Sequence, residues 1–419
     1  MHKSLLEILR CPFCGTELSL VEGGAPVLDG DEIVEGVLGC ECCAFPLLAG
    51  IPILIADDST RHALHLLEAG QRQEALLHLL QITDPARQRS FLSLVQSPNP
   101  TFQHALELLS DDAEGTWCLH RFADPVFMTI EALVGALGQE RWPFQGRVLD
   151  LCGGFGHITR VLQSQQSAGD SSAGGTVLAD LSFWKLWLAT RFAAPGASAI
   201  CCDANNPLPF APNTFSFVLL ADAFPYIWHK RMLADEMMRL VGHEGLVVMP
   251  HLHSALGENF SAGDTLTPAA YRALFAPLQP RLFSDHRLQD DVIEGRLVDL
   301  TKYVSPAEIG SEAALTLIAS PRSGLFRRYE VPTEREVRGT LAVNPLYVAE
   351  RTGSSTTLRL RFPTPEYEAE FAACRRYLPE SITLEADLTP PITEESLGAG
   401  YGYLREHRVL IDAPIGYVS

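Results

Sequence analysis

Short apolar runs alternate with helical patterns through the middle of the chain. The runs are "GRVLDL", "GTVLADL", "ASAICCD", "FSFVLLAD", "EGLVVMP" and "ALTLIAS". This alternation is typical of a parallel sheet with helices on both faces, because such strands are buried on both sides. We therefore predict an α/β fold, a doubly wound Rossmann-like sheet, over residues 117–325.

The segments on either side of this region have other patterns. Residues 1–56 contain short strand patterns joined by the Gly-rich turns "EGGAP" and "LDGDE", which predict a ribbon. Over residues 57–116, Leu and Ala recur every three or four positions, so a helical linker region is expected. Residues 326–419 show a strand, helix, strand series, which predicts a small C-terminal α+β accessory unit.

Two C-x-x-C pairs lie in the ribbon, with 25 residues between them. Four thiolates from two tight turns suit a tetrahedral Zn²⁺, so we predict the metal ligands Cys11, Cys14, Cys40 and Cys43, with Cys42 to spare. Four protein ligands leave no open position, and the predicted zinc is therefore structural. The alternative is a set of free thiols.

The residues around these pairs carry a family resemblance. "LLEILRCPFCGTELSL" followed by "GCECCAFPLLAGIPILI" resembles the zinc-ribbon family that includes the activator subunit of tRNA and release-factor methyltransferases. The resemblance implies an activator-like ribbon that is fused to the rest of the chain.

A glycine-rich turn follows the first apolar run, in "VLDLCGGFG". Asp150 ends the strand, and Gly153, Gly154 and Gly156 let the backbone approach a ligand without an intervening Cβ. The turn is neither a Walker loop nor a G-x-G-x-x-G motif. Alone, it permits a dinucleotide, a nucleotide or no ligand.

The turn and the strands after it resemble motif I and the later motifs of class I S-adenosylmethionine (SAM) methyltransferases. Cys152 takes the place of the first glycine. The resemblance places Asp180 at the ribose diol and Asp203 at the adenine amino group, although each could be an ordinary acid at a strand end. It implies SAM as cofactor and the binding residues Asp150, Cys152, Gly153, Gly154, Gly156, Asp180, Leu181, Asp203, Ala204 and Ala221.

Candidate catalytic residues follow the fourth and fifth strands. They are Asp222, His251 and His253. A histidine with a pKa near neutrality can take a proton from a hydroxyl or amine, and alternation puts the two histidines on one face if the strand continues through them. A general base, a metal pair and a purely structural role all remain open.

Charge and a missing motif bear on the methyl acceptor. The chain has 51 Asp and Glu against 32 Lys and Arg, a formal charge of −19, which disfavours nucleic acid. The Asn/Asp-Pro-Pro-Tyr signature of amino methyltransferases is missing from "ADAFPYI". We expect a methyltransferase that acts on an O or N nucleophile of a small molecule, such as a biosynthetic or glycan intermediate. The alternatives are modification of tRNA or a translation protein, and a SAM-binding scaffold without turnover.

The remaining expectations concern surroundings and partners. No run of 18 apolar residues and no signal peptide is found, and the cysteines are clustered as metal ligands are, so we expect a cytoplasmic protein without membrane contact. The helix pattern over residues 117–137 is expected to cover the cofactor and the substrate. The ribbon or the C-terminal unit could bind a partner protein or a second copy of the chain.

Overall fold

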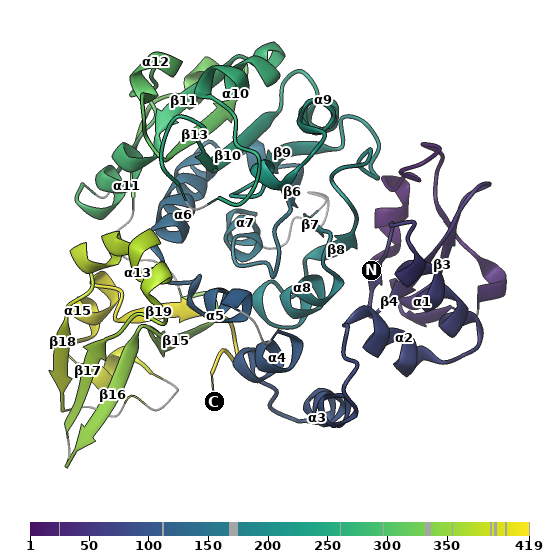
Figure 1. Ribbon diagram of the computed structural model, residues 1–419, viewed down its shortest axis with the longest axis horizontal. Coiled ribbons are helices and arrows are strands. Elements are labelled where there is room, and N and C mark those ends of the chain that lie inside the picture. The colour runs from purple at the N-terminus through teal and green to yellow at the C-terminus, as the bar shows by residue number, and fades with distance from the viewer. Residues whose placement is uncertain are drawn as a thin grey trace.

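A seven-stranded sheet forms the centre of the protein in this computed structural model (Figure 1). The structure describes residues 1–24, 26–110, 113–166, 175–259, 261–295, 297–331, 337–353, 355–385, 388, 392–398 and 400–418. In the order of the sheet, the strands are β11 (Pro280–Ser284), β13 (Ala314–Ala319), β10 (Leu246–His253), β9 (Phe215–Leu219), β6 (Arg147–Leu151), β7 (Thr176–Asp180) and β8 (Ser198–Cys201).

Neighbouring strands from β8 to β10 are parallel, whereas β13 is antiparallel to both β10 and β11. Alternate residues of one strand enter different cores: Val148 of β6 packs with one and Leu149 with another. The first core includes α6 (Pro125–Gly138), α7 (Thr159–Gln165) and α11 (Asp285–Ile293); the second includes α9 (Lys230–Val241) and α10 (Pro268–Leu274). The predicted doubly wound α/β fold is confirmed.

The N-terminal ribbon covers the β8 edge of this sheet. Its strands are β1 (Ser19–Leu20), β2 (Val27–Asp29), β3 (Glu32–Gly39), β4 (Ala44–Leu48) and β5 (Ile51–Pro52). Beyond β5, Ile53 forms a parallel bridge with Cys201, and the Leu54 N–H donates to the Cys201 carbonyl at 2.7 Å. An uncovered edge would leave strand N–H and C=O groups unpaired, so this contact continues the sheet across the ribbon boundary.

A second contact joins the ribbon to the loop after β8. The Arg10 N–H donates to the Pro209 carbonyl at 2.9 Å, and the Ala211 N–H donates to the Ile8 carbonyl at 2.8 Å. Between these bonds, Leu9 is fully buried in the same core as Phe210. Ribbon and central sheet therefore share one hydrophobic core.

Four helices connect the ribbon with the central region: α1 (Asp58–Glu68), α2 (Arg72–Leu79), α3 (Pro85–Gln96) and α4 (Phe102–Leu109). They pack with α8 (Phe183–Leu188) in a third core. In this core Phe102 of α4 stacks on Tyr417, near the end of the chain, with ring centroids 5.7 Å apart. The last of the connecting helices is thus held to the segment around Tyr417.

The single helix expected over residues 117–137 is instead two helices, α5 (Ala113–His120) and α6. Asp124 caps α6, and its carboxylate accepts a hydrogen bond from the Phe127 N–H at 2.6 Å. Pro125 follows at the first helical position. An N-cap Asp followed by Pro starts a new helix, which explains the break.

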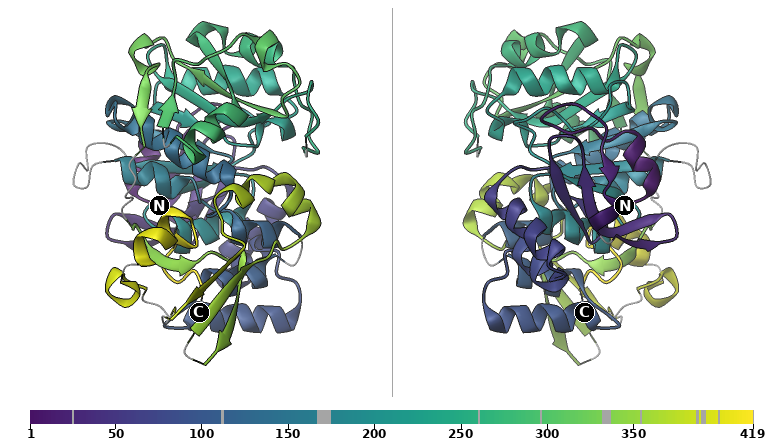
Figure 2. Two further views of the ribbon diagram at one scale, coloured as in Figure 1. Left: turned by 90° about the vertical axis from the view of Figure 1, so that its left-hand side faces the viewer. Right: turned by 90° about the vertical axis from the view of Figure 1, so that its right-hand side faces the viewer.

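The C-terminal region forms two small sheets and short helices that pack against α6 and α7 (Figure 2). Its elements are β15 (Thr340–Val343), β16 (Tyr347–Thr352), β17 (Ser355–Leu360), α13 (Pro365–Glu370), β18 (Ser381–Leu384), α14 (Glu394–Leu397), α15 (Gly400–Glu406) and β19 (Leu410–Ala413). Arg160 of α7 donates to the Asp412 carbonyl at 2.7 Å. The expected domain boundary at 325/326 falls between two paired strands, β12 (Leu297–Asp299) and β14 (Arg328–Glu330). All of the expected domain boundaries stay predictions.

Among the described residues, no helix combines the length and the apolar character that spanning a bilayer requires.

Replacing Leu9 with Ala tests the shared core. We expect Leu9→Ala to lower the free energy of unfolding by about 2–5 kcal/mol, because it leaves a cavity at a fully buried position. Leu28→Ala, on an exposed side chain of β2, is the matched control and should change it by under about 0.5 kcal/mol. Chemical denaturation of both variants measures the effect. Equal values for the two would contradict a core that runs from ribbon to sheet.

Candidate functional site

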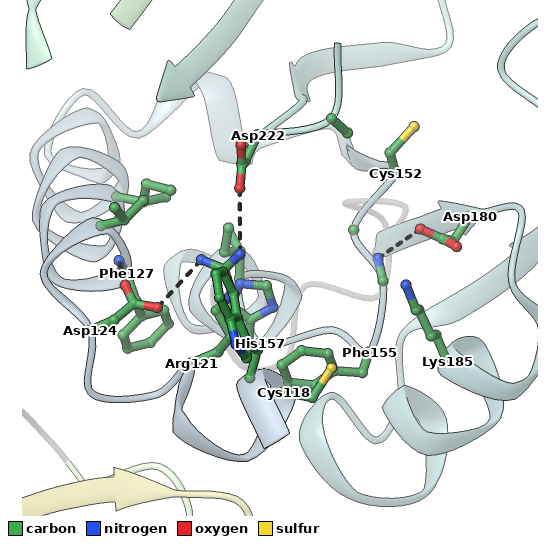
Figure 3. A pocket seen from close by; sticks show the side chains of 18 of the residues that line it. Cys118, Arg121, Asp124, Phe127, Cys152, Phe155, His157, Asp180, Lys185 and Asp222 are labelled. Carbon is green, nitrogen blue, oxygen red and sulfur yellow. Dashed lines mark hydrogen bonds and ion pairs between the residues drawn. The ribbon is translucent and has the colours of Figure 1, made fainter. Parts of the chain in front are cut away.

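A cavity of about 590 Å³ opens beside the carboxyl ends of β6, β7, β9 and β10 (Figure 3). Binding sites of open α/β sheets occur at this edge. The lining includes Glu114, Trp117, Cys118, Arg121, Asp124, Phe127, Asp150, Cys152, Gly153, Gly154, Phe155, His157, Asp180, Lys185, Ala221, Asp222, Tyr226, His253 and Glu370.

The glycine turn after β6 brings backbone to the cavity wall. Cys152 and Gly154 have φ angles of +57° and +56°, a left-handed conformation that turns the chain sharply. At Gly153 a Cβ would lie 2.5 Å from the Asp150 Cγ, so only glycine fits. Glycine is therefore required here by the closeness of the turn to Asp150 and Leu178, and its approach to a ligand stays a prediction.

Asp150 is buried beneath the turn. Its Oδ2 accepts a hydrogen bond from the Thr159 hydroxyl at 2.6 Å, whereas Oδ1 has no hydrogen-bond partner among the described residues. Burial raises the pKa of Asp150 to about 7. A buried carboxylate oxygen without a partner is costly, and a cationic ligand group would satisfy it.

Asp180 faces the same turn from the end of β7. Its two carboxylate oxygens accept from the Gly154 N–H at 2.9 Å and from the Ser182 N–H at 2.8 Å. Burial raises the pKa of Asp180, while these bonds and Lys185 act to lower it. A carboxylate has about four acceptor positions, so lone pairs remain for a ligand hydroxyl.

Four predicted cofactor residues are not among those that line the cavity: Gly156, Leu181, Asp203 and Ala204. A Cβ on Gly156 would lie 2.9 Å from the Ala189 Cβ, so this glycine serves helix packing. The Asp203 carboxylate accepts from the Asn205 N–H at 2.8 Å and from the Asn206 side chain at 3.0 Å. The Leu181 side chain is exposed. Their cofactor roles stay predictions.

Asp222 follows β9 at the opposite side of the cavity, with a φ of +52°. Its Oδ1 lies 3.0 Å from the His253 Nε2, and its Oδ2 lies 3.4 Å from an Arg121 Nη. Figure 3 shows Arg121 between Asp222 and Asp124, the latter also at 3.4 Å. Both distances exceed those of strong charge-assisted bonds, so the guanidinium can still bind an anionic ligand.

The strand β10 does continue through both histidines, whose ring centroids are 5.0 Å apart. A bulge interrupts its pairing with β13 between Met249 and Leu252, and His251 there has a φ of +55°. The His251 Nδ1 lies 2.8 Å from a carboxylate oxygen of the buried Asp285. Despite burial, the carboxylates of Asp285 and Asp222 raise the pKa of His251 to about 9.

Several polar groups in the lining were not predicted, among them Asp124, His157 and Glu370. Burial lowers the pKa of His157 to about 3, and its Nδ1 has no partner among the described residues. Burial raises the pKa of Glu370, which comes from α13 of the C-terminal region. The "ADP" sequence signals the helix cap at Asp124, but no local pattern marks Glu370, over 200 residues from the glycine turn.

The ribbon cysteines form a second cluster. One sulfur from each of Cys11, Cys14, Cys40 and Cys42 lies within 4.8 Å of the others, which is compatible with a zinc site. The sequence favoured Cys43 as the fourth ligand, whereas the structure puts Cys42 in this group. The Cys40 N–H bonds to the Cys43 carbonyl at 2.9 Å and closes a tight turn, and Cys43 packs against the core.

The environment of two of these thiols differs. The Thr16 hydroxyl lies 3.0 Å from the Cys14 sulfur and lowers the pKa of Cys14 to about 6, whereas burial raises the pKa of Cys11 to about 12. Zinc ligation requires thiolates, and a bound Zn²⁺ itself favours them.

Comparisons with known proteins found matches among solved structures only. No family model matches the sequence, and no curated protein matches it. A solved SAM-dependent methyltransferase from Aquifex aeolicus matches with 15% identity and a TM-score of 0.33, over 48% of this chain and 96% of its own. One from Thermotoga maritima matches with 14% identity and a TM-score of 0.34, over 53% and 100%.

A third solved structure is a complex between the Haloferax volcanii Trm112 methyltransferase activator and a methyltransferase. One chain of this complex matches with 14% identity and a TM-score of 0.32, over 49% of this chain and 91% of its own.

Zinc content of cysteine variants distinguishes the two candidates for the fourth ligand. We expect Cys42→Ser to reduce bound zinc from one ion per chain to well below one, because its sulfur belongs to the cluster. Cys43→Ser should retain the ion. Elemental analysis of the dialysed proteins measures both. The opposite pattern would restore the sequence-based choice of Cys43. If Cys11→Ser retained its zinc ion, this cysteine cluster would not be the zinc site.

Proposed function

We propose that the protein is a SAM-dependent methyltransferase that methylates an O or N nucleophile of a small molecule, with a structural zinc ribbon fused in the same chain. One observation carries the proposal: the unpartnered, buried Oδ1 of Asp150 lies beneath a turn that only glycine permits, at the cavity edge of the sheet. When bound, SAM supplies an electrophilic methyl group on a sulfonium.

The lining offers a partner for each polar part of SAM. Asp150 would accept from the ammonium group, and the Gly153–Gly154 backbone leaves room for the methionine chain. Asp180 would accept from the ribose hydroxyls, which supports the role that the sequence assigned to it. Arg121, loosely paired in the structure, would bind the carboxylate.

The rest of the cavity would hold the acceptor. Asp222, His253 and Glu370 line it, and its volume lies in the range of small-molecule sites, about 300–1,000 Å³. A formal charge of −19 also disfavours a nucleic-acid acceptor. The chain would bind, orient and deprotonate this acceptor, and the surrounding apolar side chains would keep water out.

The proposal extends to location and partners. Zinc-ligating cysteines need a reducing compartment, which supports a cytoplasmic protein. The ribbon already covers the β8 edge within the chain, so this edge needs no separate activator subunit. Contacts with further partners would then use other surfaces of the ribbon or the C-terminal unit.

Gly153→Ala tests the cofactor cradle. We expect SAM affinity to fall at least about tenfold, or 1.4 kcal/mol, because the new Cβ would displace the Asp150 carboxylate and the turn. Isothermal titration calorimetry with SAM measures the change. Gly135→Ala, in α6 with open space around its Cβ position, is the matched control and should retain affinity. Unchanged affinity in both variants would argue against this cradle.

The acceptor class can be measured directly. We expect methyl-labelled SAM, incubated with the protein and a cell extract, to label the small-molecule fraction. Label in RNA or protein would instead support the tRNA or translation-protein alternative. Tight SAM binding without label in any fraction would support a non-catalytic scaffold.

A further inference from the structure

Three side chains at the acceptor end of the cavity have the composition of a metal site. Asp222, His251 and His253 each offer one ligand atom, and these atoms lie within 4.8 Å of one another. When two ligand atoms each lie about 2.1 Å from one ion, the distance between them is at most about 4.2 Å. Small side-chain rotations would therefore bring these three atoms within bonding distance of one ion. We propose that these residues bind a divalent transition-metal ion, which holds a methyl acceptor through two neighbouring oxygen atoms. The acceptor role rests on the proposed function; the metal site does not.

The ring nitrogens of the two histidines are directed to different carboxylates. The His253 Nε2 lies 3.0 Å from the Asp222 Oδ1, so an ion between these two residues would take the place of the proton between them. The His251 Nδ1 is directed to Asp285, which leaves its Nε2 as the ligand atom for an ion. Metal ligation requires deprotonated imidazole nitrogens, so binding would release the protons held there.

Asp285 gives His251 the support that metal-binding histidines usually have. Such residues donate their second ring N–H to a carboxylate, which fixes the ring and increases its basicity. Asp285 is buried, and its other oxygen accepts from the Thr316 hydroxyl at 2.8 Å. The hydrogen bonds from Thr316 to Asp285 and between Asp285 and His251 therefore hold the His251 ring in place before any ion binds.

The charge around the cluster favours a cation. Three acids, Asp124, Asp222 and Glu370, line this part of the cavity, and a fourth, Asp285, contacts His251. These acids outnumber the single guanidinium of Arg121. Buried carboxylates are tolerated where they are paired or bind a metal.

Three protein ligands leave coordination positions open for the acceptor. Imidazole and carboxylate donors suit Mn²⁺, Fe²⁺ or Co²⁺, while the thiolate cluster of the ribbon suits Zn²⁺. A bound ion would lower the pKa of a coordinated hydroxyl, whose proton would pass to solvent. The electron pair left on the oxygen would form the new C–O bond as the S–C bond of SAM breaks, with the demethylated thioether as the leaving group. The acceptor class is thus a hydroxyl with an adjacent hydroxyl, carbonyl or carboxylate group.

Binding of Mn²⁺ or Co²⁺ to the full chain, with zinc retained in the ribbon, tests the site. Electron paramagnetic resonance counts free Mn²⁺, and absorption follows Co²⁺. We expect one site per chain, at least 100-fold weaker in His253→Ala and His251→Ala. Asp285→Asn should weaken it by about 10–100-fold, since it changes only the support of a ligand.

Two controls keep the result interpretable. His243→Ala removes an exposed histidine that precedes the start of β10, whereas the cluster histidines lie at the carboxyl end of this strand, and it should bind Mn²⁺ as the unaltered protein does. Thermal unfolding of each variant shows whether it folds. Absence of binding of both ions to the unaltered protein would overturn the proposal, as would equal affinity in His253→Ala and His243→Ala.

SAM titration of the same samples separates the two proposals. SAM binding without metal binding contradicts only the metal site. Metal binding without SAM binding contradicts the proposed function and leaves the metal site in place.

Discussion

The parallel register of four strands is the constraint on which the rest of the structure depends. Asp150 of β6 lies opposite Leu219 of β9, and Leu219 lies opposite Val248 of β10. Because these strands run in one direction and end at one edge, the residues after each strand meet around a single cavity. Asp150, Asp180, Asp222 and the two histidines of β10 come together there, although more than 100 residues separate the first from the last.

Backbone strain is concentrated where these strands end. Cys152, Asp222 and His251 all have positive φ, a conformation that costs a non-glycine residue about 1–3 kcal/mol unless packing imposes it. Asp and His tolerate it better than most residues. Pro250 precedes His251 in a central strand, where it has no N–H to donate, and the bulge there accommodates it. The bulge interrupts the regular pairing of β10 with β13 at this point. It also orients the side chain of His253 toward Asp222.

The sequence predicted the sheet well because its strands are buried on both faces. All six apolar runs became strands, whereas the edge strand β11, "PRLFS", was missed because polar residues interrupt its apolar pattern. The site was less predictable. The glycine turn has a local signature, but Glu370 and Asp285 reach it only through tertiary packing. The choice between Cys42 and Cys43 depends on one tight turn, which spacing alone does not determine.

The two flanking units act on different ends of the same cavity. The ribbon pairs with β8, the neighbour of β7, and so supports the strand that ends in Asp180 on the proposed cofactor side. The C-terminal region supplies Glu370, which lines the same cavity as Asp222 and His253 on the proposed acceptor side. Its core is shared with α6, whose cap Asp124 contacts Arg121. Cofactor binding should therefore depend on the ribbon, and the choice of acceptor should depend on the C-terminal region.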